Sequence, residues 1–176
     1  PLPGIGIRVV DPEAGAARPV GSAGEIQVQG GHVTPGYYKM PEQSARAWRN
    51  GWFHTGDAFM QDEDGNFFFL DRMRDTIRRR GENISSIEVE DVLYKHPAVA
   101  FCAVVAKPDE KWGETPCAFV ELRPGHSATQ EEIIEWCRQG LARYKVPRHV
   151  IFTEVPKTST GKIQKFKLRE MAKEAE

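Results

Sequence analysis

The chain has 176 residues, of which 40% are hydrophobic and 28% are charged, a composition typical of a globular protein with a real core. Its formal net charge of −1 provides no overall field that would attract nucleic acid or an anionic membrane. No apolar run approaches the roughly 20 residues that a membrane helix needs. We therefore expect no nucleic-acid partner, no stable membrane insertion and, by default, a cytoplasmic protein.

Cysteine usage argues against a disulfide framework and against a zinc site. The cysteines Cys102, Cys117 and Cys137 are odd in number, lie in apolar stretches and show no C-x-x-C spacing. We expect buried free thiols and no metal-binding residues in this chain.

The first part of the chain is predicted to be rich in β-structure. Apolar and polar side chains alternate from Gly24 to Gln29, which is the period of a half-buried strand. Pro41 is typical of the first turn of a helix, and Asn50-Gly51 is expected to close that helix. The predicted strands are 5–10, 24–29, 52–55, 58–60 and 66–70, with a hairpin turn at 62–65.

The rest of the chain is predicted to pack helices on a small sheet. Ser85 and Glu88 have the spacing of a capping box, as do Thr129 and Glu132, so a helix is expected to begin at each. The first of these helices should stop at His96-Pro97. Strands are predicted at 99–105, 115–122 and 149–152, with helices from 129 to about 142 and at 166–173. This order predicts an α+β fold with helices on a mixed or antiparallel sheet.

Two domains are predicted, residues 1–71 and residues 72–176. The first would have many strand edges and no helix layer of its own, so it would be marginal as an independent domain. We therefore interpret residues 1–71 as the β-rich end of a larger domain, followed by a separate small domain.

Thr55-Gly56-Asp57 is the first stretch that could carry chemistry. A glycine between strand residues lets a ligand approach the backbone closely, and an ionised Asp57 can accept two hydrogen bonds from a vicinal diol such as a ribose. The alternative is a turn in which the aspartate caps its own backbone, the commoner use of Asp beside Gly. No nucleophile pattern accompanies His54, for which a structural role is expected.

Arg72 and Arg74 occupy alternate positions within the stretch 71–75. In an extended segment they would point to one face, where guanidinium groups suit phosphate or hydroxyl oxygens. The alternative is a surface cluster of ion pairs with Asp71 and Asp75. The basic run 78–80 is interpreted as a solvated face.

The stretch from Pro156 to Lys162 superficially resembles a phosphate-binding P-loop. That motif needs a glycine five positions before the Gly-Lys pair and a Ser or Thr after it, but these positions hold Pro156 and Ile163. Lys162 could instead place a point charge on substrate oxygens from a turn of small residues. The alternative is one more surface lysine. Trp112, in a polar loop, could stack on an adenine or pack over a sheet edge.

Three motifs in this order resemble the adenylate-forming superfamily, which includes acyl-CoA synthetases, luciferases and the adenylation domains of peptide synthetases. The residues that carry the resemblance are Gly51-Trp52-Phe53-His54-Thr55-Gly56-Asp57, then Asp71-Arg72-Met73-Arg74-Asp75 with Gly81-Glu82-Asn83 and Glu88-Val89-Glu90, then Pro156 through Lys162. The resemblance covers nearly the whole chain and is to the C-terminal portion of acyl-CoA synthetases. It implies the end of a large N-terminal domain followed by the complete mobile C-terminal domain.

The resemblance implies an enzyme that couples a carboxylic acid to coenzyme A through an acyl-adenylate formed from ATP. Asp57 would hold the ribose hydroxyls and Arg72 would assist at the nucleotide. Lys162 would be catalytic, bridging the substrate carboxylate and the phosphate oxygens. The hinge position of the family, commonly Asp or Lys, is Arg74 here.

For the CoA step, the resemblance implies that Gly81 lets the pantetheine arm pass close to the backbone, with Trp112 and Tyr144 near the CoA nucleotide. Mg²⁺ would be bound with ATP by ligands outside this chain. Lys162 matches sites at which family members are silenced by acetylation, so a lysine acetyltransferase is an expected partner. The fragment alone is expected to be inactive. The alternatives are a non-catalytic module that binds CoA, a nucleotide or a partner, and the adenylation domain of a peptide synthetase.

Overall fold

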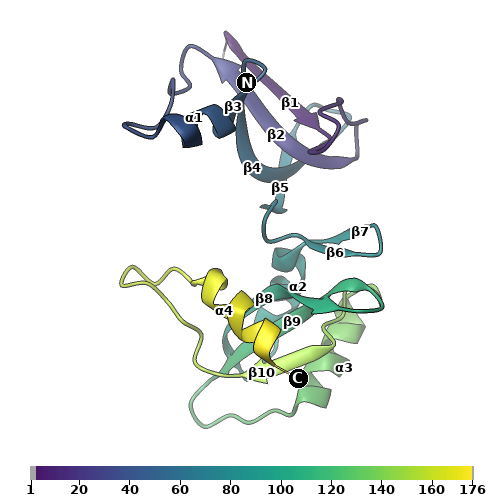
Figure 1. Cartoon of the computed structure of the whole chain (residues 1–176). Coiled ribbons are helices and arrows are strands. Elements are labelled where there is room, and N and C mark those ends of the chain that lie inside the picture. The colour runs from purple at the N-terminus through teal and green to yellow at the C-terminus, as the bar shows by residue number, and fades with distance from the viewer. Residues whose placement is uncertain (1–2, 176) are drawn as a thin grey trace. The chain divides into compact units, whose positions relative to one another are not determined.

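A computed structural model describes residues 3–175, which form four helices and ten strands (Figure 1). The chain divides into two compact units, residues 1–74 and residues 75–176. The sequence had placed the boundary between residues 71 and 72, but strand β5 (Phe67–Arg72) continues through Arg72. Helices and mainly antiparallel sheets occur together, which confirms the predicted α+β class. No helix among the described residues has the length and apolar character needed to cross a membrane.

The first unit contains an antiparallel sheet and one short helix. Its order is β1-β2-β4-β3, and β5 pairs with β4 beyond the end of β3. The buried apolar side chains of this unit are few: Val9, Val10, Ile26 and Ala58. The elements are β1 (Ile5–Val10), β2 (Ala23–Gly30), α1 (Pro41–Ala47), β3 (Trp48–Arg49), β4 (Trp52–Gln61) and β5.

Asn50-Gly51 does not close helix α1, as the sequence had suggested. The helix has Pro41 in its first turn as predicted, but it ends at Ala47. Asn50 and Gly51 instead form a two-residue turn between β3 and β4, with φ values of 54° and 77°. Both values are positive, as a type I′ hairpin turn requires, and Asn-Gly is the pair that this turn prefers. The preference of Asn-Gly for a hairpin turn therefore outweighed its use as the end of a helix.

Strand β4 runs without a break through Gly56-Asp57, where the sequence had predicted a gap between two strands. On β2, Gln27 pairs with His54 and Glu25 pairs with Ala58, so three residues of β4 lie opposite Ile26. The extra residues form a bulge in which Gly56 has a φ of 70°. A bulge keeps the strand paired while it redirects one or two side chains.

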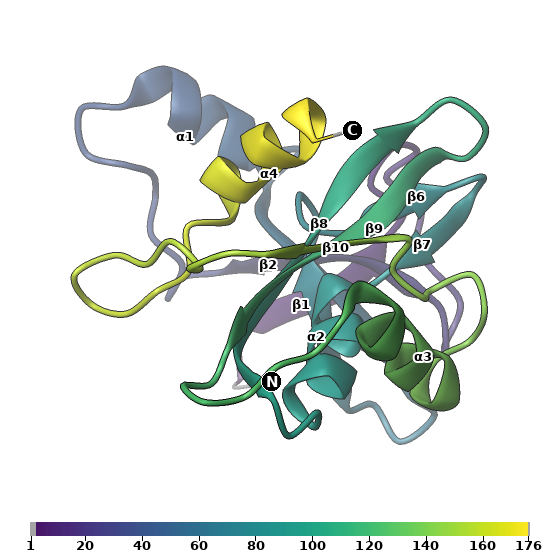
Figure 2. The same cartoon turned by 90° about the horizontal axis from the view of Figure 1, so that it is seen from below.

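The second unit contains a mixed sheet with helices on both faces (Figures 1 and 2). The strand order is β10-β9-β6-β7, with β8 paired to β9; β10 is parallel to β9 and the other pairs are antiparallel. The elements are β6 (Ile77–Arg79), β7 (Glu82–Ile84), α2 (Ser86–Tyr94), β8 (Val99–Asp109), β9 (Gly113–Leu122), α3 (Gln130–Gly140), β10 (His149–Phe152) and α4 (Lys165–Glu174).

The two faces of this sheet have separate hydrophobic cores. Alternate residues of β8 and β9 point to opposite faces, as strand geometry requires. Helices α2 and α3 cover one face, where Leu93 and Ile133 pack with Val104 and Val120. Helix α4 covers the other face, where Leu168 packs with Phe119 and other residues of the same strands. All three cysteines are buried and free, as predicted.

Both predicted capping residues begin a helix, but only one capping box is complete. At α3, Thr129 and Glu132 bind each other's backbone N–H groups. At α2, Ser85 accepts a hydrogen bond from the backbone of Glu88, while the Glu88 carboxylate pairs with Lys145, 2.6 Å from its Nζ. A distant cation thus competes with the helix terminus for this carboxylate.

Candidate functional site

The bulge of β4 presents Asp57 next to Arg72. Asp57 and Arg72 pair across β4 and β5, and Arg72 Nε lies 3.0 Å from Asp57 Oδ1. The Thr55 hydroxyl donates to the backbone oxygen of Ile26 and accepts from the backbone N–H of Asp57. Asp57 therefore does not cap its own turn, and its carboxylate projects from a bulge that neighbouring groups hold in place.

A buried polar cluster supports the bulge from behind. Glu25 is 7% exposed, and its carboxylate accepts from the backbone N–H of Gly56 at 3.2 Å and from His54 Nδ1 at 2.7 Å. Gln27 also donates to Glu25 and accepts two hydrogen bonds from Arg8. His54 is thus a structural residue, as the sequence suggested, and Glu25 is one that the sequence did not reveal.

The arginines that follow do not share an extended face. Residues 73–75 form a turn directly after β5, so the predicted alternation of Arg72 and Arg74 is wrong. The backbone N–H of Met73 donates to the Gly56 oxygen, which ties the turn to the bulge. Arg74 is the last residue of the first compact unit, and Asp75, the first of the second, pairs with Arg169 of α4.

Lys162 lies on a tight exposed turn that leads into α4. The Thr158 backbone N–H donates to the Lys162 oxygen at 2.8 Å, and the Lys162 N–H donates to the Thr158 hydroxyl at 3.1 Å. Gly161 has a φ of 82°, which a residue with a side chain would adopt only with strain. Within the described chain, no carboxylate pairs with the Lys162 ammonium. The ammonium group is therefore available to a ligand.

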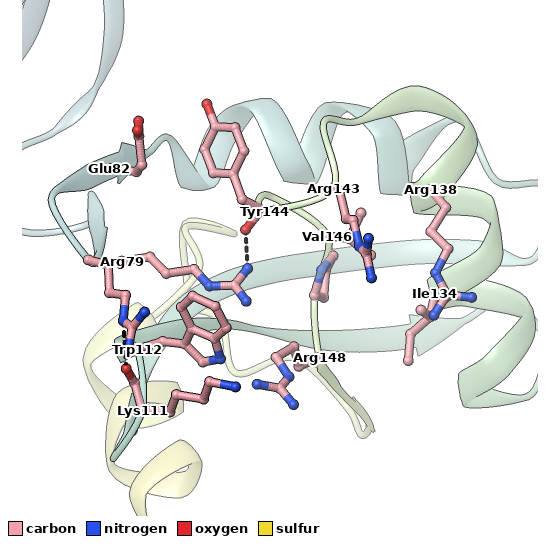
Figure 3. A pocket seen from close by; sticks show the side chains of 12 residues that line it. Arg79, Glu82, Lys111, Trp112, Ile134, Arg138, Arg143, Tyr144, Val146 and Arg148 are labelled. Carbon is pink, nitrogen blue, oxygen red and sulfur yellow. Dashed lines mark hydrogen bonds between the residues drawn. The ribbon is translucent and has the colours of Figure 1, made fainter.

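An open pocket of about 770 Å³ lies elsewhere on the second unit (Figure 3). It is formed by the β6–β7 hairpin, the loop between β8 and β9, helix α3 and the segment 143–148. Six cationic side chains and one carboxylate line it: Arg79, Arg80, Lys111, Arg138, Arg143, Arg148 and Glu82. So uneven a distribution of charge, in a chain whose net charge is −1, suits a ligand with several negative charges.

Trp112 is the aromatic centre of this pocket. The guanidinium carbons of Arg79 and Arg80 lie 4.6 and 4.7 Å from its ring centroid, and Lys111 Nζ lies 5.1 Å away. The predicted basic run 78–80 is thus not merely a solvated face, because two of its arginines contact a tryptophan. Cations on an aromatic face and a flat ring are the elements that bind a charged nucleotide.

Asp109 holds the loop that carries Trp112. Its Oδ1 accepts from the backbone N–H groups of Lys111 and Trp112, each at 2.9 Å, and its Oδ2 lies 3.5 Å from Arg148. Burial raises the pKa of the Asp109 carboxyl, but these hydrogen bonds and the neighbouring arginines outweigh it and keep the pKa below its usual range. The ionised carboxylate therefore holds the backbone of the loop that carries Trp112 and pairs with the Arg148 guanidinium.

The remaining CoA candidates lie at the same place. Tyr144 lines the pocket, and its backbone oxygen accepts a hydrogen bond from Arg79, which Figure 3 shows beside Trp112. Gly81 is at the tip of the β6–β7 hairpin, between two lining residues, with a φ of 85° and open space where a Cβ would be. The structure thus groups Trp112 and Tyr144 in one pocket and keeps the Lys162 turn outside it.

Comparison with known proteins identifies the protein family to which part of this chain is related. Residues 88–162 match the family model of the AMP-binding enzyme C-terminal domain. Residues 88–162 therefore belong to the C-terminal domain family of AMP-binding enzymes, and the chain as a whole is similar to members of this class.

Within this class, the chain resembles CoA ligases and acyl-activating enzymes. It is 52% identical to 2-methylpropanoate–CoA ligase CCL4 of Humulus lupulus, over 95% of this chain and 31% of that protein. ATP-bound MatB from Rhodopseudomonas palustris has a TM-score of 0.86 at 36% identity, over 98% of this chain and 35% of that one.

A second similar structure is o-succinylbenzoate CoA synthetase from Bacillus subtilis in complex with its acyl-adenylate intermediate. Its TM-score is 0.85 at 33% identity, over 100% of this chain and 35% of that one. The chain thus spans about a third of the length of the relatives that it matches.

Proposed function

We propose that this chain is the C-terminal portion of an AMP-forming acid–CoA ligase. Residues 1–74 would be the end of the large domain and residues 75–176 the mobile C-terminal domain. The relatives support this assignment because they include a CoA ligase, a CoA synthetase in complex with its acyl-adenylate, and an ATP-bound protein. The partners are then a small carboxylic acid, ATP and CoA.

In the first half-reaction, the carboxylate of the acid attacks the α-phosphate of ATP, and pyrophosphate leaves. Asp57, presented by the bulge, accepts hydrogen bonds from the ribose hydroxyls, and Arg72, its ion-pair partner, orients that carboxylate beside the nucleotide. Lys162 places its ammonium between the carboxylate and phosphate oxygens as negative charge moves between them. A preorganised charge of this kind stabilises the transition state without further rearrangement.

In the second half-reaction, the CoA thiol attacks the acyl carbon and AMP leaves. The pocket around Trp112 suits the nucleotide of CoA, which carries three phosphate groups and an adenine. Its arginines and Lys111 would bind the phosphates, and Trp112 or Tyr144 would stack on the adenine. Gly81 leaves open space beside the hairpin backbone for the pantetheine arm.

Two half-reactions that use separate surfaces of one domain require that domain to move. We assign the hinge to Arg74, which ends the first compact unit and is followed by a residue of the second. A hinge residue has to permit a change of backbone torsion angles and does not need a particular side chain. An arginine is therefore compatible with this role.

The described residues do not fit a magnesium site. No group of three or more His, Cys, Asp or Glu side chains among residues 3–175 could hold a metal ion. Magnesium with ATP would need ligands from outside this chain. Three buried free cysteines support a reducing compartment, and we place the protein in the cytoplasm.

The single observation that carries this proposal is that one AMP-binding C-terminal domain holds Lys162 on an exposed turn and a cationic pocket around Trp112 at another place. The test uses the full-length enzyme. Lys162→Ala should lower acid-dependent ATP–pyrophosphate exchange by about a hundredfold or more and leave acyl-CoA formation from supplied acyl-adenylate within twofold.

Trp112→Ala should do the opposite. It should raise the KM for CoA about tenfold, in line with the ~1–3 kcal/mol of a base–aromatic stack, and leave the exchange unchanged. Full exchange activity in Lys162→Ala would overturn the proposal. Acetylation of Lys162 by a lysine acetyltransferase should resemble Lys162→Ala, because it removes the charge from an exposed ammonium.

A further inference from the structure

The two lysines that flank Lys162 have partners, although all three are close in sequence. Lys157, before the turn, lies 2.8 Å from the Glu121 carboxylate. Lys165, the first residue of α4, lies 2.7 Å from the Glu90 carboxylate. Lys162, between them, is exposed. The turn is thus held by an ion pair at each end, and its central cation is left for a ligand.

The first anchor fixes the strand-like segment that enters the turn. Glu121 Oε2 accepts from Lys157 Nζ and also from the backbone N–H of Val155, at 2.9 Å. The Lys157 ammonium lies 3.8 Å from the centroid of the Phe101 ring, a distance typical of a cation–π contact. The hydrogen bond from Lys157 holds the pKa of the Glu121 carboxyl below its usual range. Residues of both β8 and β9 therefore hold Lys157 at the start of the turn.

The second anchor fixes the start of α4. Lys165 Nζ lies 2.7 Å from both Glu90 Oε1 and the Ser86 hydroxyl, and both partners belong to α2. Glu90 Oε1 also accepts from the backbone N–H of Val104, in strand β8, at 2.7 Å. The side chains of Lys165 and Glu90 are only 17% and 14% exposed, so solvent screens this pair less than a surface pair.

Between the anchors the chain has little freedom. The Gln164 N–H donates to the Pro156 oxygen at 2.8 Å, and Lys157 pairs with Ile163 across a short β-bridge. The Thr158 and Thr160 hydroxyls lie 2.8 Å apart inside the turn. The Lys162 turn is therefore tied to the domain through both anchors and through its own hydrogen bonds.

We propose that Glu121 and Glu90 are positioning residues for the adenylation step, acting through Lys157 and Lys165 to hold the Lys162 turn in the orientation that adenylation requires. This inference rests on the proposed function, in which Lys162 serves the first half-reaction and is withdrawn in the second. Displacement of a catalytic group by about 1 Å can cost on the order of a hundredfold in rate. Loss of an anchor should therefore affect one half-reaction selectively.

The test compares lysine variants at both anchors in the full-length enzyme. Lys157→Met and Lys165→Met keep the aliphatic stem and remove the ion pair. Each should lower ATP–pyrophosphate exchange about tenfold or more, with thioester formation from supplied acyl-adenylate within twofold of the unsubstituted enzyme. Lys157→Arg and Lys165→Arg, which can still pair with the carboxylates, should recover at least a third of the exchange activity.

Lys173→Met is the matched control. Lys173 is also on α4 and pairs with Glu170 at 3.0 Å, but it is 57% exposed and lies at the far end of the helix from the turn. Both half-reactions should be unchanged in this variant, because exposed pairs contribute little.

A merely structural role would give a different pattern. If the Met variants lost both half-reactions by the same factor, or if exchange stayed within twofold, the inference would be wrong. If Lys165→Met failed to fold, Lys157→Met would decide, because its anchor is nearer the surface. Failure of the proposed function looks different: Lys162→Ala itself would then retain exchange, whereas failure of this inference alone leaves Lys162→Ala inactive in exchange.

Discussion

Cys117 and Cys137 show how burial changes the chemistry of a single residue. Both thiols are fully buried, and burial raises the pKa of each to about 11 from an ordinary value of 9.0. The pKa of Cys102 is also raised by burial, and further by the nearby Glu90 carboxylate. These thiols are therefore protonated and unreactive in the folded protein at neutral pH.

The raised thiol pKa values predict a loss of stability at alkaline pH. Between pH 9 and pH 11 the folded state binds more protons at these cysteines than the unfolded state, so the free energy of unfolding falls as pH rises. Well below pH 9 the cysteines are protonated in both states, and they no longer make the free energy of unfolding depend on pH. Urea unfolding of the protein at pH 8.0, 9.5 and 10.5 measures this effect.

The control variant for this prediction is Cys137→Ala, which should show a shallower decline than the unsubstituted chain. Tyr94→Phe is also needed. Burial raises the pKa of Tyr94, so ionisation of this phenol also makes the free energy of unfolding depend on pH in the alkaline range. A free energy of unfolding that stays constant from pH 8.0 to 10.5 would contradict the prediction.

Among the elements, two hairpins share one turn geometry with different sequences. Asn50-Gly51 and Arg80-Gly81 each connect two strands with two residues of positive φ. Asparagine tolerates this conformation well, whereas a residue such as Arg80, with a φ of 46°, is strained by ~1 kcal/mol. Arg80 contacts Trp112, so the strain persists where the side chain has a use.

Arg80→Asn should therefore stabilise the β6–β7 hairpin and weaken the pocket. We expect the free energy of unfolding to rise by about 0.5–1 kcal/mol and the KM for CoA to increase several-fold, because one cation is lost. Thermal unfolding and CoA-dependent kinetics of the full-length enzyme measure the two effects. Arg78→Asn is the matched control, since Arg78 lies in the same hairpin but does not line the pocket. Lower stability in Arg80→Asn would contradict the prediction.

The sequence predicted most elements because their signals are local. Thr129 and Ser85 each cap a helix, and the apolar runs of β8 and β9 form paired strands that contribute to both hydrophobic clusters. The bulge at Gly56 was missed because it depends on the pairing of β4 with β2, and pairing between distant strands leaves no local signal. The misassignment of Asn50-Gly51 came from two competing local signals.

The site was predictable only as separate residues. Asp57, Arg72, Lys162, Trp112 and Tyr144 could be named from motifs and resemblance, and their roles remain proposals. Arg79 and Arg80 were interpreted as part of a solvated basic run. The pocket's other arginines and its loop anchor Asp109 could not be named, because the pocket brings together segments 30 to 70 residues apart. Glu90 and Glu121 were hidden for the same reason, since each partner lies far along the chain.

For the whole molecule, the distribution of buried side chains predicts unequal stability of the two units. Both large hydrophobic clusters consist of residues between Ile77 and Ala172, inside the second unit. Among its described residues, 3–74, the first unit has only four buried apolar side chains. Residues 75–176 expressed alone should therefore fold with a cooperative thermal transition, whereas residues 1–74 alone should not.

Circular dichroism and the dispersion of amide signals in NMR spectra distinguish these outcomes. A cooperative transition for residues 1–74 would show that the polar cluster around Glu25 stabilises the first unit more than its small core indicates. Absence of a transition for residues 75–176 would mean that contacts outside the two clusters are needed for folding.

The placement of the Trp112 pocket away from α4 has a pharmacological consequence under the proposed function. No residue of α4 or of the turn before it lines the pocket. A compound lodged there would block the thiol substrate without touching the ammonium that serves ATP. With such an inhibitor bound, the enzyme would still activate its acid. The mixed anhydride, acyl-AMP, would then stay bound or dissociate slowly.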